Sequence, residues 1–495
     1  MNKPPVVAVL DVGKTNKKVA LYDANFRAVD LKKISLDAVP NGDGIEYEQT
    51  EELFRWTCKI LAEFAEVYDI RAIGITTHGA TLAVLDRDGE LAHPVISYLS
   101  PAGDRVEDEF NEKFGPPEKI HSETCTPPFG FANAAKQIYF LQKFFPQDWE
   151  KAQHLLYFPQ YLGYLFTGKM AADPTYLGCH TYLWDLRKSC PSEVARELGV
   201  DGMIPEKVLA PWDELGTVGE SVAEESGIPA GIPVVVGIHD SNASLLPYLA
   251  KGFDRFTLNS TGTWCVAMTP SDGFDFEPNE IGTKTFYNLS AYGRPVKTAI
   301  FPGGLEFSEF SKIVGETAME NPEEINLVCR DAEIILTGGI IPGAEAFPGS
   351  VPVLRLGRQE ISLEELKEMG LDAAGIGKDT FLAALNLSLA IQTVEVLNRA
   401  GLREDSEIFV EGGFANNPEY CRILASLLPK NRVCLTELKE ATAFGTALCA
   451  WKLVEGVDLE SLSSRFEIVI RDVESAEISG LDQYVEKYRA LCTGA

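Results

Sequence analysis

Residues 6–23 read VVAVLDVGKTNKKVALYD, a stretch in which one apolar run ends at Asp11 and a second begins at Val19. Apolar runs on either side of a polar turn predict strand, turn, strand. Residues 255–268, RFTLNSTGTWCVAM, repeat this pattern about half a chain later. Each turn combines glycine with hydroxyl side chains, which directs N–H and O–H groups at one point and suits phosphate oxygens. Together the turns predict two lobes that hold a nucleotide in the cleft between them, although either turn alone is more typical of an ordinary hairpin.

Size and composition limit the class of protein. The chain has 495 residues, 45% of them hydrophobic, and a formal net charge of −29. Length predicts two or three domains with sizeable cores. The negative charge argues against a partner that is a nucleic acid or an anionic membrane, because binding either requires a basic face. It leaves room for a local basic pocket that holds a phosphorylated ligand.

Cysteine spacing and hydropathy predict a cytoplasmic protein. The ten cysteines are scattered without a CxxC pair, and with only six histidines they show no zinc-ligand spacing. Dispersed cysteines in a large chain are typical of a reduced compartment. The N-terminal residues lack the features of a signal peptide, and no charge-free apolar stretch reaches the length of a membrane span.

Strands and helices alternate along the chain and predict an α/β fold. Residues 50–67 have helical apolar spacing, and residues 233–240, PVVVGIHD, predict one buried strand that ends in a polar cluster. A long apolar helix is expected from about Thr380 to Ala400, ended by Gly401. Residues 407–418 predict a strand, a Gly412-Gly413 turn and a helix that starts with Asn417 as N-cap and Pro418 as first residue.

Two carboxylates are candidates for the chemistry. The run Val12-Gly13-Lys14-Thr15 is not a P-loop, because Ala8 stands where that motif needs glycine and a strand follows it. Asp11 ends a buried strand, so it is either a Mg²⁺ ligand or bonded to its own turn. Asp240 follows a parallel-type strand, where α/β sheets bind ligands, and is a candidate general base. Alternatively, Asp240 caps the helix that follows it. His239 would then be a buried polar residue whose hydrogen bonds are satisfied within the core.

In their order and spacing, these motifs resemble the FGGY family of carbohydrate kinases over nearly the whole chain. The resemblance implies the two-lobed ribonuclease H-like fold of actin, hexokinase and Hsp70. It implies an N-terminal lobe (1–248) with the sugar site and first phosphate loop, an ATP-binding C-terminal lobe (249–457), and a tail (458–495) that packs on the lobes.

The resemblance also implies roles for individual residues. Asp240 would be the general base and, with Asp11, lie near Mg²⁺. The sugar would be contacted by His78, Gly79, Asp104, Arg105, His239, Asp240 and Ser241. ATP would be held by Gly13, Lys14, Thr15, Asn16, Lys18, Thr261, Gly262, Thr263, Gly412, Gly413 and Asn417. Lys14 departs from the small hydroxyl residue usual in the family, and its ammonium would either contact phosphate or point to solvent.

The expected activity is ATP-dependent phosphorylation of a ketose, with ATP and Mg²⁺ as cofactors. The runs His239-Asp240-Ser241 and Ser260–Trp264 look most like those of rhamnulokinases, which favours an L-rhamnulose- or L-fuculose-like sugar. His78 and Thr81 depart from that subgroup on the sugar side. The alternatives are a kinase for xylulose or a polyol, a sugar-independent nucleotide-switch protein of the same superfamily, and a sugar-binding regulator without catalysis. A homodimer is one of the assemblies compatible with the sequence.

Overall fold

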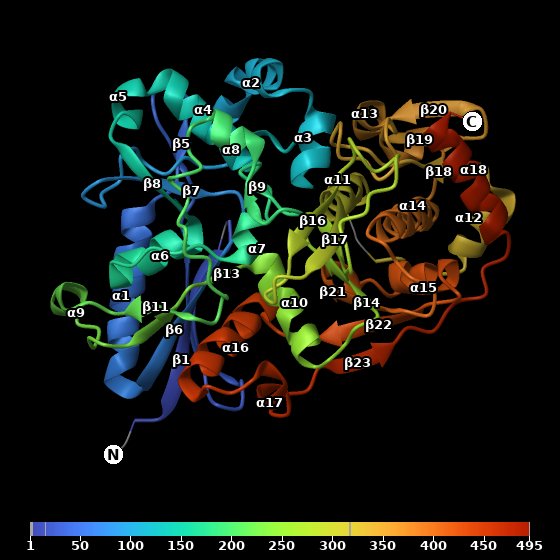
Figure 1. Cartoon of the computed structure of the whole chain (residues 1–495). Coiled ribbons are helices and arrows are strands. Elements are labelled where there is room, and N and C mark those ends of the chain that lie inside the picture. The colour runs from blue at the N-terminus through green and yellow to red at the C-terminus, as the bar shows by residue number, and fades with distance from the viewer. Residues whose placement is uncertain (1–2, 15, 316–317, 495) are drawn as a thin grey trace.

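Two lobes, each built around a seven-stranded sheet, make up the structure, a computed structural model that describes residues 3–14, 16–315 and 318–494 (Figure 1). The first half of the chain, blue to green in Figure 1, forms one lobe. The second half, yellow to red, forms most of the other. The expected two-lobed α/β fold is confirmed.

The first sheet has its most buried strands at the centre. Strand β1 is antiparallel to β2 and parallel to β6, and β6 is parallel to both β12 and β13. The strands of this sheet are β1 (Pro5–Val12), β2 (Asn16–Tyr22), β3 (Ala28–Ser35), β6 (Asp69–Thr77), β11 (Glu214–Thr217), β12 (Pro233–Val235) and β13 (Ile238–His239). The other main elements of this lobe are α1 (Thr50–Val67), β7 (Leu82–Asp86), η1 (Pro101–Arg105), α2 (Glu107–Phe114), α3 (Pro117–Thr124), α4 (Ala134–Phe144), β8 (Ala152–Tyr157), α6 (Phe158–Thr167), α7 (Pro174–Leu177) and α9 (Glu220–Ser226).

The second sheet repeats the central arrangement of the first. Strand β14 is antiparallel to β15 and parallel to β21, which is parallel to β22. The strands of this sheet are β14 (Phe256–Thr261), β15 (Cys265–Pro270), β16 (Thr285–Leu289), β17 (Pro295–Phe301), β21 (Glu407–Gly412), β22 (Arg432–Glu437) and β23 (Val469–Asp472). Both predicted hairpins, β1–β2 and β14–β15, are therefore confirmed, and each occupies the same place in its sheet. The main helices are α11 (Gly303–Val314), α12 (Glu324–Asp331), α13 (Leu363–Ala374), α14 (Lys378–Arg399), α15 (Pro418–Leu427) and α18 (Leu481–Thr493).

Two helices, α10 (Asp240–Ala250) and α16 (Ala441–Glu455), cross between the lobes (Figure 1). Helix α10 comes from the first half of the chain, yet its Tyr248 stacks on Phe409 of the second sheet. Helix α16 comes from the second half and packs on β1 and β6 of the first sheet. A Cβ atom on Gly445 would lie 1.9 Å from the carbonyl oxygen of Ala243, so this crossing requires glycine. The helices thus join the two sheets directly.

The predicted strand over residues 233–240 is wrong in one respect, because it is interrupted. Strand β12 ends at Val235 and β13 begins at Ile238. Between them Gly237 has a φ of +99°, which favours glycine, and a Cβ there would lie 3.0 Å from the Cβ of Pro159. The short β13 continues into α10 with Asp240 as the first helical residue.

Helix α14 is the core helix of the second lobe. In the described part of the chain it alone is long and apolar enough to cross a membrane, but 89% of its most apolar window is buried inside the protein. The predicted bounds, Thr380 to Ala400, are close to the observed ones, and Gly401 follows with a φ of +81°. Helix α18 buries Tyr484 and Tyr488 in the same core.

Candidate active site

Asp11, near the end of β1, and Asp240, just after β13, lie at the same edge of the first sheet on strands that flank β6. Asp11 and Ile238 both pair with Thr76, Asp11 from β1 and Ile238 from β13. Two strand spacings separate β1 from β13, about 10 Å. Asp240 lies two residues beyond Ile238, so both carboxylates lie at the carboxyl ends of parallel strands, where open α/β sheets bind ligands.

The Asp11 carboxylate is buried and paired with a lysine. Lys18 Nζ lies 3.1 Å from Asp11 Oδ2, and the same ammonium also pairs with Glu440, the residue before α16. Burial raises the pKa of Asp11 to about 6; Lys18 opposes this shift, and the charges of Asp240 and Glu440 add to it. A second cation near Asp11 would therefore stabilise its ionised form.

Asp240 is the more open carboxylate, with its side chain 33% exposed. Its Oδ1 accepts hydrogen bonds from the Ser241 backbone N–H at 2.6 Å and from the Ser241 hydroxyl at 3.2 Å. Burial raises the pKa of Asp240 above its usual range, against opposing contributions from His78 and from the Ser241 hydrogen bonds. The carboxylate is thus fixed in orientation while part of it stays accessible.

His239 is a neutral imidazole with a defined tautomer. Burial lowers its pKa to about 3. Asn242 Nδ2 donates to His239 Nδ1 at 3.3 Å, so the ring proton is on Nε2. That Nε2 lies 3.3 Å from Asp240 Oδ1 and 3.2 Å from Cys179 Sγ. A Cβ atom on Gly79 would lie only 2.8 Å from it, so the backbone at residue 79 packs directly against the imidazole.

His78, the residue before Gly79, is a second buried histidine of the site. Its ring packs between Tyr98 and Phe158, and its Nδ1 lies 3.0 Å from the carbonyl oxygen of Gly79. A proton on Nδ1 makes this contact a hydrogen bond and leaves Nε2 as an acceptor. Among the described residues this buried Nε2 has no hydrogen-bond partner.

The Lys14 side chain turns into the first lobe. Its ammonium pairs with the buried carboxylate of Glu48, donates to Ser97 Oγ at 2.7 Å and lies 5.1 Å from the ring centroid of Tyr98. The side chain of Lys17 donates to the backbone carbonyl oxygen of Lys14 at 2.6 Å, and this hydrogen bond closes the turn. The ammonium therefore lies near Tyr98, which also packs on His78, and does not extend into solvent.

The other predicted residues of this lobe lie at its surface. Asp104 and Arg105 are exposed on η1, and Arg105 donates to the carbonyl oxygen of Asp43. Within the described ranges, no hydrogen bond or ion pair connects them to His78 or His239. Gly13 lies in the first turn and Asn16 is exposed at the start of β2. Thr15 lies outside the described residues.

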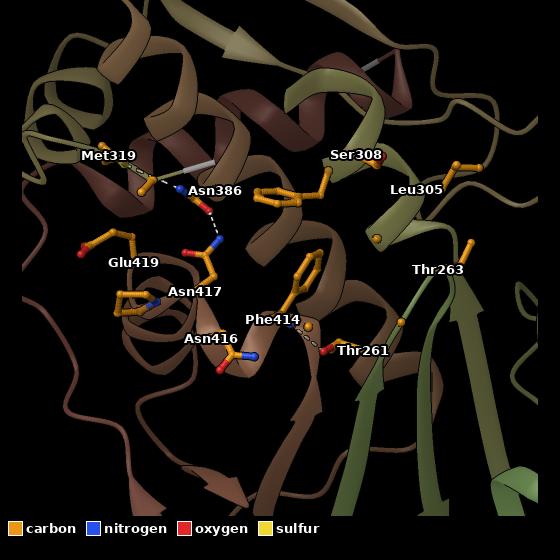
Figure 2. A pocket seen from close by; sticks show the side chains of 16 residues that line it. Thr261, Thr263, Leu305, Ser308, Met319, Asn386, Phe414, Asn416, Asn417 and Glu419 are labelled. Carbon is orange, nitrogen blue, oxygen red and sulfur yellow. Dashed lines mark hydrogen bonds between the residues drawn. The ribbon is translucent and has the colours of Figure 1, made fainter. Parts of the chain in front are cut away.

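A cavity of about 570 Å³ lies in the second lobe beside the second turn (Figure 2). We call it the second-lobe cavity. Of the predicted residues, it is lined by Thr261, Gly262, Thr263, Gly413 and Asn417. Its remaining lining residues are Gly304, Leu305, Phe307, Ser308, Ala318, Met319, Asn386, Phe414, Asn416, Pro418 and Glu419. Its size lies within the range of sites for small molecules and cofactors.

Gly412 supports the rim of the cavity. Its φ is +82°, and a Cβ there would lie 2.0 Å from the carbonyl oxygen of Thr261. The Thr261 hydroxyl donates to the carbonyl of Glu411 and accepts from the N–H of Phe414 at 2.9 Å. Gly412 therefore allows β21 to approach β14 closely where both strands end, whereas a Cβ on Gly413 would lie 3.7 Å from the carbonyl oxygen of Thr261.

Several residues of the site are not among those predicted from the sequence: Glu48, Ser97, Tyr98, Cys179, Asn386 and Glu440. Most belong to no recognisable motif. Asn386 and Gln392 are both buried amides inside the apolar run of α14, so the sequence pattern alone does not single out Asn386.

Comparison with known proteins agrees with this two-lobed arrangement. The model of the FGGY family of carbohydrate kinases, N-terminal domain, matches residues 6–247, and that of the carbohydrate kinase FGGY, C-terminal domain, matches residues 253–457. A crystal structure of a carbohydrate kinase from Novosphingobium aromaticivorans superposes with a TM-score of 0.81 at 25% identity, covering 100% of this chain and 99% of that one.

Two named kinases are similar in sequence. The L-fuculokinase of Escherichia coli K12 is 24% identical over 466 residues, 91% of this chain and 92% of that protein. The rhamnulokinase of Enterococcus faecalis is 27% identical over 194 residues, 39% of this chain and 38% of that protein.

The fold and the matched domains define a two-lobed sugar kinase. The chain belongs to the FGGY family of carbohydrate kinases. The expected enzyme class is thereby confirmed, and kinases of this family use ATP with a divalent metal ion.

Proposed function

We propose that this kinase transfers the γ-phosphoryl group of ATP to a hydroxyl of a ketose, with Asp240 as the general base. The observation that carries the proposal is the setting of Asp240 at the strand end beside His239. Its carboxylate is oriented by Ser241, partly accessible, and close enough to Asp11 for its charge to raise the pKa of Asp11. A general base has to be oriented and accessible in this way to reach a substrate hydroxyl.

The proposed sugar is an L-fuculose- or L-rhamnulose-like ketose. Support comes from the named relatives, of which the L-fuculokinases match along 91% of this chain and the rhamnulokinases along a shorter part. A polar group of the site suits a polyhydroxy ligand: His78 Nε2 is an acceptor that has no hydrogen-bond partner among the described residues. Tyr98 adds an aromatic ring beside His78.

Asp11 and Asp240 fit a site for Mg²⁺. The raised pKa of Asp11 indicates a carboxylate that lacks enough positive charge around it, even with Lys18 nearby. Among the described residues, no three His, Cys, Asp or Glu side chains gather as a metal site. A Mg²⁺ ion between these carboxylates would take its other ligands from phosphate and water, as this ion commonly does.

In the mechanism that follows, the first-lobe residues hold and deprotonate the sugar. His239 packs beside the Asp240 carboxylate, and Asp240 accepts the proton of the attacking hydroxyl. The hydroxyl and N–H of Thr263 hold phosphate oxygens, Thr261 and Gly262 shape the turn that presents them, and the nucleoside lies in the second-lobe cavity. Bound Mg²⁺ would offset the charge on the phosphates, which is the main electrostatic requirement of phosphoryl transfer. Closing the lobes excludes water, so that the sugar is the acceptor.

A sugar panel tests the proposal directly. The purified protein is assayed for ADP release with Mg-ATP and each of L-fuculose-, L-rhamnulose- and D-xylulose-type ketoses and glycerol. We expect ADP release that depends on the sugar and is fastest with one of the first two. ADP release at the same rate without any sugar would contradict the proposal, and a clear preference for xylulose or glycerol would overturn the sugar assignment alone.

A further inference from the structure

The second-lobe cavity has two chemically different ends (Figure 2). Thr261 and Thr263 lie at one end, where the exposed Thr263 of the β14–β15 turn presents its hydroxyl. Asn386, Asn417 and Met319 lie at the other end, with the ring of Phe414 between the two. A nucleotide whose phosphates are held by the turn would direct its base toward the amide end.

The amide end is a chain of hydrogen bonds with a fixed direction. Asn417 Oδ1 accepts the backbone N–H of Tyr420 at 3.2 Å, because Asn417 caps α15. The Nδ2 group of Asn417 therefore faces Asn386 and donates to Asn386 Oδ1 at 2.8 Å. Since that oxygen must accept, the Nδ2 group of Asn386 points away from Asn417. The backbone at Tyr420 thus sets the orientation of both amides.

The Nδ2 group of Asn386 has a weak partner. It is directed at the sulfur of Met319, 3.6 Å away, and a thioether is a poor acceptor. Asn386 is 2% exposed, in a helix that is otherwise buried along most of its length. A buried amide donor whose partner among the described residues is a sulfur atom gains most from a ligand atom with a free lone pair.

We propose that Asn386 selects the base of the phosphoryl donor by donating a hydrogen bond to ring atom N1 of adenine. This inference rests on the proposed binding of ATP in the second-lobe cavity. Adenine N1 is an acceptor, whereas N1 of guanine and of hypoxanthine carries a proton. A guanine in the same position would place two N–H groups against each other, and a buried mismatch of this kind is strongly disfavoured.

The substitution Asn386→Asp separates base reading from structural support. The carboxylate can still accept from Asn417, so the link between α14 and α15 is kept. It can no longer donate to adenine N1, but it can accept from guanine N1–H. A purely structural role would leave the ratio of adenine to guanine affinities unchanged, and charge repulsion would weaken both nucleotides alike.

The experiment measures binding of ADP, GDP and IDP to the full-length protein by calorimetry, without sugar. The wild type should bind ADP about tenfold or more tightly than GDP or IDP. Asn386→Asp should lower the affinity for ADP by about tenfold. The preference for ADP over GDP should become smaller or reverse. The matched control Asn398→Asp, an exposed amide on the same helix, should behave like the wild type.

Each other outcome has a defined meaning. Equal wild-type affinity for ADP, GDP and IDP overturns the role of Asn386, whether or not the variant folds, and leaves the kinase proposal intact. An unchanged ADP to GDP ratio in a folded Asn386→Asp variant overturns it as well. Failure of the wild type to bind any adenine nucleotide contradicts the proposed function itself.

Discussion

Asp11 and Lys18 form an ion pair of 3.1 Å across the first hairpin, and the same lysine pairs with Glu440 at the start of α16. One ammonium group thus connects the candidate metal ligand of the first lobe to the second half of the chain. Even so, burial keeps the pKa of Asp11 raised to about 6. Without another cation nearby, the ionised Asp11 carboxylate is therefore unfavourable in the folded state. Its cost to the free energy of unfolding can be measured.

Replacement of Asp11 by Asn should stabilise the metal-free protein. The folded state holds the Asp11 proton more tightly than the unfolded state, so the free energy of unfolding falls as pH rises from about 3.8 to about 6. The linkage relation gives a cost of about 3 kcal/mol at pH 7.5 and about 1 kcal/mol at pH 4.5. Denaturant unfolding at both pH values should show gains up to these limits in Asp11→Asn.

The same variant should lose Mg²⁺-dependent turnover. Activity titrated with Mg²⁺ at saturating ATP checks this part. A gain in stability that is equal at both pH values would contradict the role of the carboxylate charge, and an unchanged dependence on Mg²⁺ would contradict the metal assignment.

Lys14 should matter for the first lobe more than for ATP. Burial acts to raise the pKa of Glu48, but Lys14, with His78 and Lys17, outweighs it and holds that pKa below its usual value. The loss of Lys14 therefore removes the main group that stabilises the buried carboxylate. Breaking such a pair costs on the order of 3 kcal/mol, and removing both charges costs less. We therefore expect Lys14→Met to lower the unfolding free energy and Lys14→Met/Glu48→Gln to recover much of it.

Steady-state kinetics of the double variant decide between the two roles of Lys14. If the Lys14 ammonium only holds Tyr98 and His78 in position, the KM for sugar should change. The KM for ATP should then stay within about threefold of the wild-type value. A large rise in the KM for ATP with an unchanged KM for sugar would instead restore the phosphate contact expected from the sequence.

Gly79 should tolerate no side chain. A Cβ there would lie 2.8 Å from His239 Nε2 and 3.0 Å from Cys179 Sγ, so Gly79→Ala must displace the imidazole. Overpacking of this kind costs about 1–3 kcal/mol. The variant should show a higher KM for sugar and a lower kcat, with ADP affinity unchanged. Gly202→Ala, where nothing lies within 4 Å of the added Cβ, is the matched control. Wild-type kinetics in Gly79→Ala would remove His239 from the sugar site.

The sequence predicted best what depends on neighbouring residues. The two hairpins, and the N-cap Asn417 followed by Pro418, are local patterns that the structure confirms. The break in the strand after Val235 was missed because the β-branched run dominates the pattern. Gly237 is required there by tertiary contacts with Pro159 and Ile75, which no local pattern reveals.

The candidate site was predicted less completely for the same reason. Glu48 and Ser97 meet Lys14 from distant positions in the chain, so their roles follow only from the folded structure. Lys14 was expected at phosphate or in solvent because nothing near it in sequence offers a buried carboxylate partner. Asn386 lies in the apolar run of α14 together with other buried polar residues such as Ser388 and Gln392, so its amide did not stand out as a sign of a polar cavity.

The central claim is that Asp240 accepts the proton of the sugar hydroxyl. The most direct measurement is the rate of sugar-dependent ADP release by Asp240→Asn at saturating Mg-ATP, with the exposed Asp254→Asn as control. The account predicts a kcat lower by about 10²–10⁴-fold, with sugar binding by calorimetry within about threefold of the wild type. A kcat near that of the wild type, in a variant that still binds sugar and ATP, would contradict it.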